Sequence, residues 1–258
     1  MATYYYYEDA TGTSDGLSEA NAYDGSSTVT LPDDSSGVCS FRNVYDALQS
    51  GDTLYVKKSS SAISFGGSFT NTTSPANPAD HDDVAGYGSL NIIGYQTTIG
   101  DGKRAEIDMG GATWWLKNYV KLTNINLINM SYSGNSIIVN KASRFVNCGF
   151  YKTTGGGEIL RILQHAYVDR CEFVYDYSVS GVNTDACVEI ANSANVVITN
   201  CYFEAGNGAN GIYVPTVGVS GHVIKNCIFN INQDKNGQGN NNGRGIYYLD
   251  VTYEHVSS

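Results

Sequence analysis

A six-residue motif that recurs along the chain is the sequence feature that most constrains its fold. Each copy has an apolar residue first, asparagine or arginine third, cysteine fourth and phenylalanine sixth. The four copies are residues 145–150, 168–173, 198–203 and 224–229. A fifth segment, 122–127, keeps the pattern with isoleucine and leucine in place of cysteine and phenylalanine. The copies begin 23 to 30 residues apart, which suits one coil of a solenoid per copy.

The order of residue types within the motif has a direct structural interpretation. The first residue points inward at the end of one strand, and asparagine makes a bend because it tolerates the left-handed conformation. Cysteine and phenylalanine then point inward on the next strand, and coils stacked about 4.8 Å apart give interior ladders of asparagine, cysteine and aromatic rings. The pattern therefore predicts an all-β fold, a right-handed parallel β-helix. The alternative, an antiparallel β-sandwich, does not predict a residue-matched repeat.

Short apolar segments between the motif copies predict a further strand in each coil: 137–139, 159–162, 188–190, 211–214 and 245–248. Some coils are longer than the shortest spacing between motif copies, and their extra residues lie in polar stretches. We expect these stretches to leave the coil as loops: 177–185, 204–210 and 232–243. Upstream, residues 58–88 predict a long excursion, after which 90–93 and 105–107 resume the coils.

The N-terminal part of the chain predicts a single amphipathic helix. Ser40 suits the N-cap, an apolar stripe follows it, and Gly51 suits the stop. Residues 52–56 then predict the first strand. We expect the helix to cover the open end of the first coil, which would otherwise expose apolar side chains and unpaired strand edges. The predicted division is an N-terminal arm with its capping helix, 1–51, and a β-helix domain, 52–258.

These features together resemble the pectate-lyase-like superfamily of right-handed β-helices. The resemblance rests on the opening Gly16-Leu-Ser, the helix with the segment 51–56, the repeated motif and the turn Gly100-Asp-Gly102. It covers roughly residues 10–250 and implies the fold. The superfamily contains lyases, hydrolases, epimerases, phage tailspikes and non-catalytic virion proteins, so the resemblance leaves the function open.

Few residues are candidates for catalysis. Asn183-Thr-Asp185 is similar to the first acidic motif of polygalacturonase-type hydrolases, but the further motifs of those enzymes do not follow it. Arg161 and Glu189 are expected to face outward on adjacent coils, where a surface salt bridge is the commoner outcome. No predicted outward column gathers two acids, so we expect no catalytic site. If the chain is an enzyme, the candidates are Asp185, Glu189 and Arg161.

The cysteines and histidines predict no metal site and no cofactor. Four cysteines occupy one inward column as small buried apolar groups, and their parallel side chains give poor disulfide geometry: Cys148, Cys171, Cys201 and Cys227. All six cysteines of the chain are expected to be free thiols. The acidic segment 80–83 lacks the spacing of a calcium loop, and His165, His222 and His255 are scattered.

Composition limits the partners. The net charge of −10 disfavours nucleic acid and anionic membranes, and no apolar run is long enough to insert into a bilayer. The tyrosine-rich, lightly charged sequence suits neutral glycans or protein partners. Several aromatic residues exceed what the core columns need and could stack on sugars or form subunit contacts. They are Tyr4 to Tyr7, Trp114, Trp115, Tyr175, Tyr177, Tyr247 and Tyr248.

The function that these observations predict is a non-enzymatic virion surface protein, a phage capsid decoration protein or tail appendage. The N-terminus shows no signal-peptide pattern, so we expect synthesis in the host cytoplasm followed by assembly on the virion surface. The expected partners are capsid or tail proteins of the same particle, further copies in a homotrimer, and a cell-surface glycan. The alternative is a polysaccharide lyase or glycoside hydrolase, and a third possibility is a carbohydrate-binding adhesin.

Overall fold

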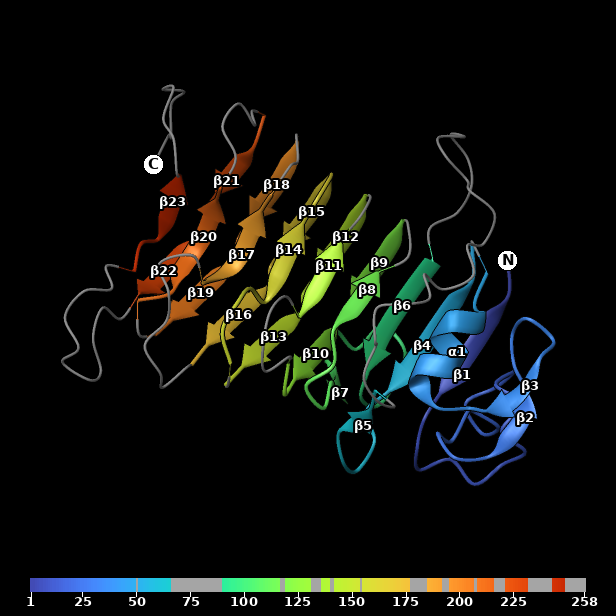
Figure 1. Cartoon of the computed structure of the whole chain (residues 1–258). Coiled ribbons are helices and arrows are strands. Elements are labelled where there is room, and N and C mark those ends of the chain that lie inside the picture. The colour runs from blue at the N-terminus through green and yellow to red at the C-terminus, as the bar shows by residue number, and fades with distance from the viewer. Residues whose placement is uncertain are drawn as a thin grey trace.

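The computed structural model is an elongated parallel β-solenoid, with β1 (Thr3–Tyr6) at one end and β23 (Ile246–Tyr248) at the other (Figure 1). This confirms the predicted all-β solenoid. In the part of the chain that the structure describes, the strands form three parallel sheets and one small antiparallel pair. The described residues are 1–49, 51–65, 90–116, 119–130, 136–139, 142–153, 155–176, 185–191, 195–206, 208–215, 221–231 and 243–248.

Each coil contributes a strand to each of the three sheets in turn. The first sheet contains β1 (Thr3–Tyr6), β4 (Thr53–Lys57), β6 (Leu90–Tyr95), β9 (Val120–Thr123), β12 (Ser143–Val146), β15 (Ala166–Asp169), β18 (Val196–Thr199) and β21 (Val223–Lys225). The second contains β5 (Ile63–Ser64), β7 (Ala105–Asp108), β10 (Ile125–Ile128), β13 (Gly149–Lys152), β16 (Glu172–Tyr175), β19 (Tyr202–Ala205) and β22 (Ile228–Ile231). The third contains β8 (Trp114–Leu116), β11 (Ile137–Val139), β14 (Leu160–Ile162), β17 (Ala186–Ile190), β20 (Asn210–Val214) and β23 (Ile246–Tyr248).

The repeated motif forms the bend between the first and second sheets. The third residue of every copy has a positive φ, between 52° and 58°, and this includes Arg170 as well as the asparagines. Strand pairing then aligns the copies residue for residue, because Phe150 pairs with Phe173, and Phe203 with Phe229. The predicted register of the coils is therefore confirmed.

The phenylalanine and cysteine columns face the interior, as predicted. The rings of Phe150, Phe173, Phe203 and Phe229 stack at centroid distances of 4.7, 5.0 and 4.8 Å. Beside them, Cys148, Cys171 and Cys201 are buried, and Cys227 is half-buried near the C-terminal end. All six cysteines are free, which confirms the prediction of reduced thiols.

The asparagine column is buried only at its N-terminal end, where Asn124 is 9% exposed, so the prediction of an interior asparagine ladder is wrong for the later coils. Asn200 and Asn226 are exposed, and Asn147 is half-buried. The amides nevertheless form a ladder along the outer corner, in which Asn147 Nδ2 donates to Asn124 Oδ1 at 2.8 Å. The left-handed bend turns the side chain away from the core, which leaves the interior to the apolar residues on either side of it.

The N-terminal part adds strands that the sequence did not predict. Strand β1 pairs in parallel with β4, so β4 is not the first strand of the solenoid, and hydrogen bonds of this sheet cross the predicted boundary at residues 51 and 52. Two further strands, β2 (Thr28–Thr30) and β3 (Ser36–Val38), form the antiparallel pair. The division into 1–51 and 52–258 stays a prediction.

A single short helix, α1 (Phe41–Ala47), is present in the described part of the chain. Ser40 is its N-cap, as predicted, and its side chain accepts a hydrogen bond from Asn43 N. The helix ends at Ala47 because Leu48 is already extended, so the stop predicted at Gly51 is wrong. Phe41 and Tyr45 pack on the buried ring of Trp114 at 6.0 and 5.1 Å. The role of the helix as a cap stays a prediction.

The predicted loops fall largely outside the described residues. Within the excursion predicted at 58–88, β5 adds to the second sheet, and 66–89 are not described. Residues 177–184 and 232–242, from two of the other predicted loops, are also outside the described residues. None of the described residues belongs to a helix with the length and hydropathy of a membrane span.

Candidate functional site

Two of the predicted catalytic candidates lie side by side on the outer face of the third sheet. Arg161 on β14 pairs in register with Glu189 on β17, and Arg161 Nε lies 3.4 Å from Glu189 Oε2. The prediction that they lie on adjacent coils is confirmed, but Glu189 is buried, so the pair is not the exposed surface salt bridge that the sequence suggested. They belong to one row of register partners: Trp115, Ile138, Arg161, Glu189, Tyr213 and Tyr247.

The third candidate, Asp185, lies just before β17. Its carboxylate is buried, and Oδ1 accepts a hydrogen bond from Gly157 N at 2.8 Å. Asn183 and Thr184, the rest of the acidic motif, lie outside the described residues. The short distance from Asp185 to Gly157 shows that this carboxylate holds the connection between β13 and β14.

Two titratable residues that the sequence reasoning missed complete this cluster. Lys152 at the end of β13 is fully buried, and its Nζ donates to Gly156 O at 2.8 Å. Burial lowers the pKa of Lys152 to about 8, against the opposing effect of the acids Glu158 and Asp185. The pKa of Glu158 is raised to about 8, by burial first and by the neighbouring carboxylate of Glu189 second.

We call Lys152, Glu158, Arg161, Asp185 and Glu189 the buried charge cluster. A carboxyl group with a raised pKa beside a second carboxylate can in principle exchange protons with a substrate. Access is restricted here, because Asp185 and Glu189 are only 3% and 5% exposed. Arg161 also binds Glu189, and the Gly157 amide binds Asp185. These contacts suit a polar network that holds the corner of the coil.

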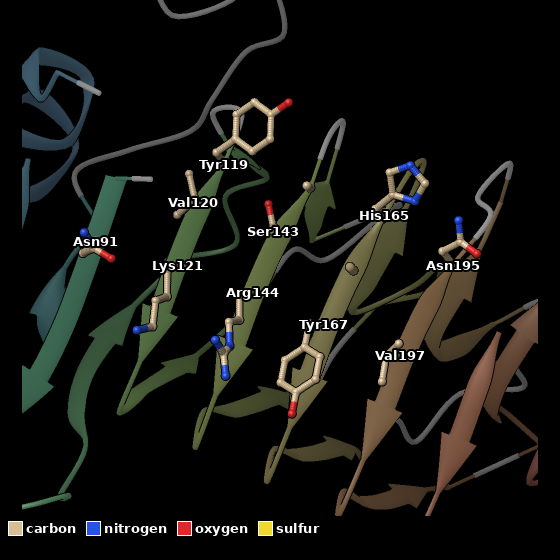
Figure 2. A pocket seen from close by; sticks show the side chains of 12 residues that line it. Asn91, Tyr119, Val120, Lys121, Ser143, Arg144, His165, Tyr167, Asn195 and Val197 are labelled. Carbon is tan, nitrogen blue, oxygen red and sulfur yellow. The ribbon is translucent and has the colours of Figure 1, made fainter. Parts of the chain in front are cut away.

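A groove of about 530 Å³ lies elsewhere, on the outer face of the first sheet (Figure 2). We call it the outer groove. It crosses strands β6, β9, β12, β15 and β18 and therefore runs along the solenoid axis. Its lining residues are Asn91, Tyr119, Val120, Lys121, Ala142, Ser143, Arg144, His165, Ala166, Tyr167, Asn195 and Val197.

The floor of the outer groove is one row of register partners. Lys121 pairs with Arg144, and Arg144 with Tyr167, while Asn91 and Val197 extend the row at its two ends. Figure 2 shows Lys121, Arg144 and Tyr167 on three neighbouring strands. The guanidinium carbon of Arg144 lies 4.7 Å from the centroid of the Tyr167 ring. Stacking of this kind orients the guanidinium group.

The rim of the outer groove is formed by residues at the starts of the strands. Tyr119 and Asn195 precede β9 and β18, and both have a positive φ, 59° and 63°. His165 precedes β15, and Figure 2 shows its ring and that of Tyr119 at the same edge. The groove thus combines hydrogen-bonding groups, aromatic rings and two cations.

Sequence reasoning missed the outer groove because it considered the wrong outward column. The outward column directly before the bend is Thr123, Val146, Asp169, Thr199 and Lys225, in which no two acids gather. The column two residues earlier also faces outward, because side chains alternate along a strand. It contains Lys121, Arg144 and Tyr167, so period-two alternation, counted back from the motif, could have found the cation pair.

The predicted surface aromatics have mixed locations. Tyr6, Trp114 and Tyr175 are buried, so for them the interpretation as surface rings is wrong. Trp115 and Tyr247 lie in the outer row of the third sheet, where the rings of Tyr213 and Tyr247 stack at 5.4 Å. Tyr177 lies outside the described residues. The tyrosines of the N-terminal segment form β1 and follow it, which is the edge-strand location.

The remaining candidates do not assemble into a metal site. Within the described ranges, no group of three or more histidine, cysteine, aspartate or glutamate side chains could hold a metal ion. His165 lines the outer groove, and His222 lies at the start of the coil that contains β21. The segment 80–83 and His255 are outside the described residues.

Comparison with known proteins identifies no relative: no family model, no curated protein and no solved structure matches the chain.

Proposed function

We propose that this chain is a non-enzymatic binding protein that holds a linear glycan in the outer groove. The observation that carries the proposal is the direction of the groove, which crosses five neighbouring strands of one sheet. Neighbouring strands are about 4.8 Å apart, which is close to the length of one sugar unit in an extended glycan. Successive units would therefore meet the same kind of surface on successive coils.

The lining of the groove is chemically suited to sugars. Aromatic rings such as Tyr119 offer an apolar face and a polar edge, which matches the two kinds of surface on a pyranose ring. Asn91 and Asn195 offer amide donors and acceptors for hydroxyl groups. Lining by a few polar groups among apolar and aromatic ones is typical of small-ligand sites.

We further propose the setting that the sequence suggested: the surface of a virion, as a phage capsid decoration protein or tail appendage. The free cysteines support this proposal, because a chain that folds in a reducing cytoplasm keeps its thiols reduced. The proposed partners are capsid or tail proteins of the same particle, with the chain as a homotrimer. Membership of the pectate-lyase-like superfamily, as in tailspikes, is part of the same proposal and is supported by the repeated motif.

The binding function is tested by titrating the intact protein with linear oligosaccharides of varied composition in a calorimeter. We expect at least one to bind, to be recovered uncleaved, and to bind about tenfold more weakly to Tyr119→Asn, which removes the ring and keeps a residue that tolerates a positive φ. Tyr202→Asn, on the second sheet, is the matched control and should bind normally. Equal affinity of both variants would reject the outer groove as the site.

The buried charge cluster favours a second candidate function, a polysaccharide lyase or glycoside hydrolase. The supporting observation is the neutral carboxyl of Glu158 beside Glu189, since glycoside hydrolysis uses one protonated and one ionised carboxyl. Incubation with the same oligosaccharides tests it. Product formation by the wild type that is lost in Asp185→Asn with Glu189→Gln would promote the enzyme and overturn our choice.

A further inference from the structure

We infer that the glycan bound by the outer groove is anionic, and that Lys121 and Arg144 bind its charged groups. This inference rests on the proposed function and adds the ligand class to it. It departs from the expectation of a neutral glycan, which was based on the composition of the whole chain. The local charge of the groove differs from that average.

The charge of the groove is opposite to that of the protein. The chain has a formal net charge of −10, yet the lining residues include Lys121 and Arg144 and no aspartate or glutamate among those described. A concave surface lined by one sign of charge concentrates ligands of the opposite sign. On an acidic protein, such a surface gives anions a local site of attraction that the net charge of the chain does not indicate.

The two cations also lack the acidic partners that other cations of the chain have. Elsewhere in the described residues, basic side chains pair with acidic ones, as Arg42 does with Asp46, Lys57 with Glu19, Arg104 with Glu172, Arg161 with Glu189, and Arg170 with Asp169. No described carboxylate pairs with Lys121 or Arg144. The positive charge of the groove is therefore free to interact with a ligand.

Lys121 and Arg144 are moreover direct register partners on neighbouring strands. Like charges in this arrangement repel each other and destabilise the sheet. An anion that lies between the two side chains removes the repulsion and gains a charge-assisted hydrogen bond from each of them. The Tyr167 ring holds the Arg144 guanidinium in place, which leaves its N–H edge available for a carboxylate or sulfate group.

The inference is tested with a matched pair of ligands on the full chain. One is a hexasaccharide of β-linked uronic acid, and the other is the same hexasaccharide with its carboxyl groups reduced to neutral hydroxymethyl groups. We expect the wild type to bind the acidic ligand at least about tenfold more tightly, with an affinity that falls as salt is added. A sulfated hexasaccharide in a third arm shows whether the groove prefers sulfate over carboxylate, and preference for either anion supports the inference.

Variants identify the residues that recognise the charged groups of the ligand. Lys121→Gln with Arg144→Gln should lose the preference for the acidic ligand and keep the affinity for the neutral one. Arg144→Lys should keep part of the preference, because lysine retains the charge without the planar fork. Lys225→Gln is the matched control, since Lys225 is an exposed lysine of the same sheet outside the groove, and it should bind as the wild type does.

The outcomes separate the two proposals. Equal binding of acidic and neutral ligands, or a preference that survives in the double variant, would overturn the anionic assignment and leave glycan binding in place. Failure of every glycan to bind would overturn both. The salt dependence is measured on the wild type, so the test holds even if the double variant fails to fold.

Discussion

Each coil depends on one residue that bends the backbone between the first and second sheets. Asparagine adopts the left-handed conformation at low cost, whereas Arg170 adopts the same φ of 53° without that preference. In the next coil, Asn200 therefore has no asparagine amide below it to accept its hydrogen bond. Its Nδ2 donates instead to Oδ1 of Asp169, the residue before Arg170, at 2.8 Å. Thr199 Oγ1 donates to the same oxygen at 2.9 Å. Asp169 thus replaces the missing amide.

Replacing Asn200 with glycine tests the strength of this exposed ladder, because glycine removes the amide and adopts the positive φ of 55° without the strain that alanine would add. We expect a loss of about 0.5–1.5 kcal/mol in the free energy of unfolding, the net value of an ordinary hydrogen bond, because Asp169 keeps its bond from Thr199. Chemical denaturation with fluorescence detection measures the change. A loss above about 3 kcal/mol would show that the amide satisfies a buried group instead.

The buried charge cluster makes stability depend on pH at a single glutamate. The pKa of Glu158 is raised from its usual 4.5 to about 8, by burial first and by Glu189 second. The folded protein therefore holds this proton more tightly than the unfolded chain does. Its contribution is fully present below pH 4.5 and is lost as the pH rises toward 8. Lys152, whose lowered pKa is also about 8, adds little change below pH 7.

Glu158→Gln removes this titration and keeps a neutral side chain of the same shape. Between pH 5 and pH 7.5 we expect the Tm of the wild type to fall by roughly 6–12 °C more than that of the variant, which corresponds to about 3 kcal/mol for a pKa that folding raises from 4.5 to about 8. Differential scanning calorimetry at several pH values gives both curves. Parallel curves would contradict a raised pKa at this residue.

The strands that contain the repeated motif could be predicted from the sequence. The first, fourth and sixth residues of the motif point inward and the third makes the bend, so only one alignment of neighbouring coils places every copy correctly. The strands of the N-terminal part were harder to predict. Strand β1 has the sequence Thr-Tyr-Tyr-Tyr, in which every second tyrosine could belong to a core or a surface. Its place is decided by pairing with β4, about 50 residues later in the chain, and no local pattern reports this contact.

The bounds of helix α1 could likewise be predicted only in part from the local sequence. Its N-cap follows from Ser40, but its end is decided by the extended backbone of Leu48, whose buried side chain joins the core. The rings of Phe41 and Tyr45 pack with Phe65 around Trp114. This aromatic group lies toward the N-terminal end of the solenoid, where the chain brings α1 beside the first coils (Figure 1).

The capping role of α1 is tested by Tyr45→Ala. Removing a fully buried ring is expected to cost about 3–5 kcal/mol of stability and to expose the end of the core, with aggregation as the result. Arg42→Ala, on the outer face of the same helix, should change stability by less than about 1 kcal/mol. Size-exclusion chromatography and thermal unfolding report both effects. If a chain lacking residues 1–50 stays soluble, monomeric and folded, the helix is not a cap.

At the scale of the whole molecule, the solenoid turns positions far apart in sequence into continuous rows. Lys121, Arg144 and Tyr167 are each separated by 23 residues, and the fold makes them neighbours along the axis. The periodicity therefore predicts the architecture, while the function depends on which outward row is free of acids and not covered. That second property depends on the conformations of side chains and strand connections, which the repeat does not specify.

The location of the bound glycan tests the account most directly. A crystal structure of the full chain with the tightest-binding oligosaccharide should show the ligand uncleaved across the outer groove, with its charged groups at Lys121 and Arg144. A ligand bound over the third sheet instead, at Arg161 and Glu189, or found as cleaved product there, would contradict the proposed function and support the enzyme.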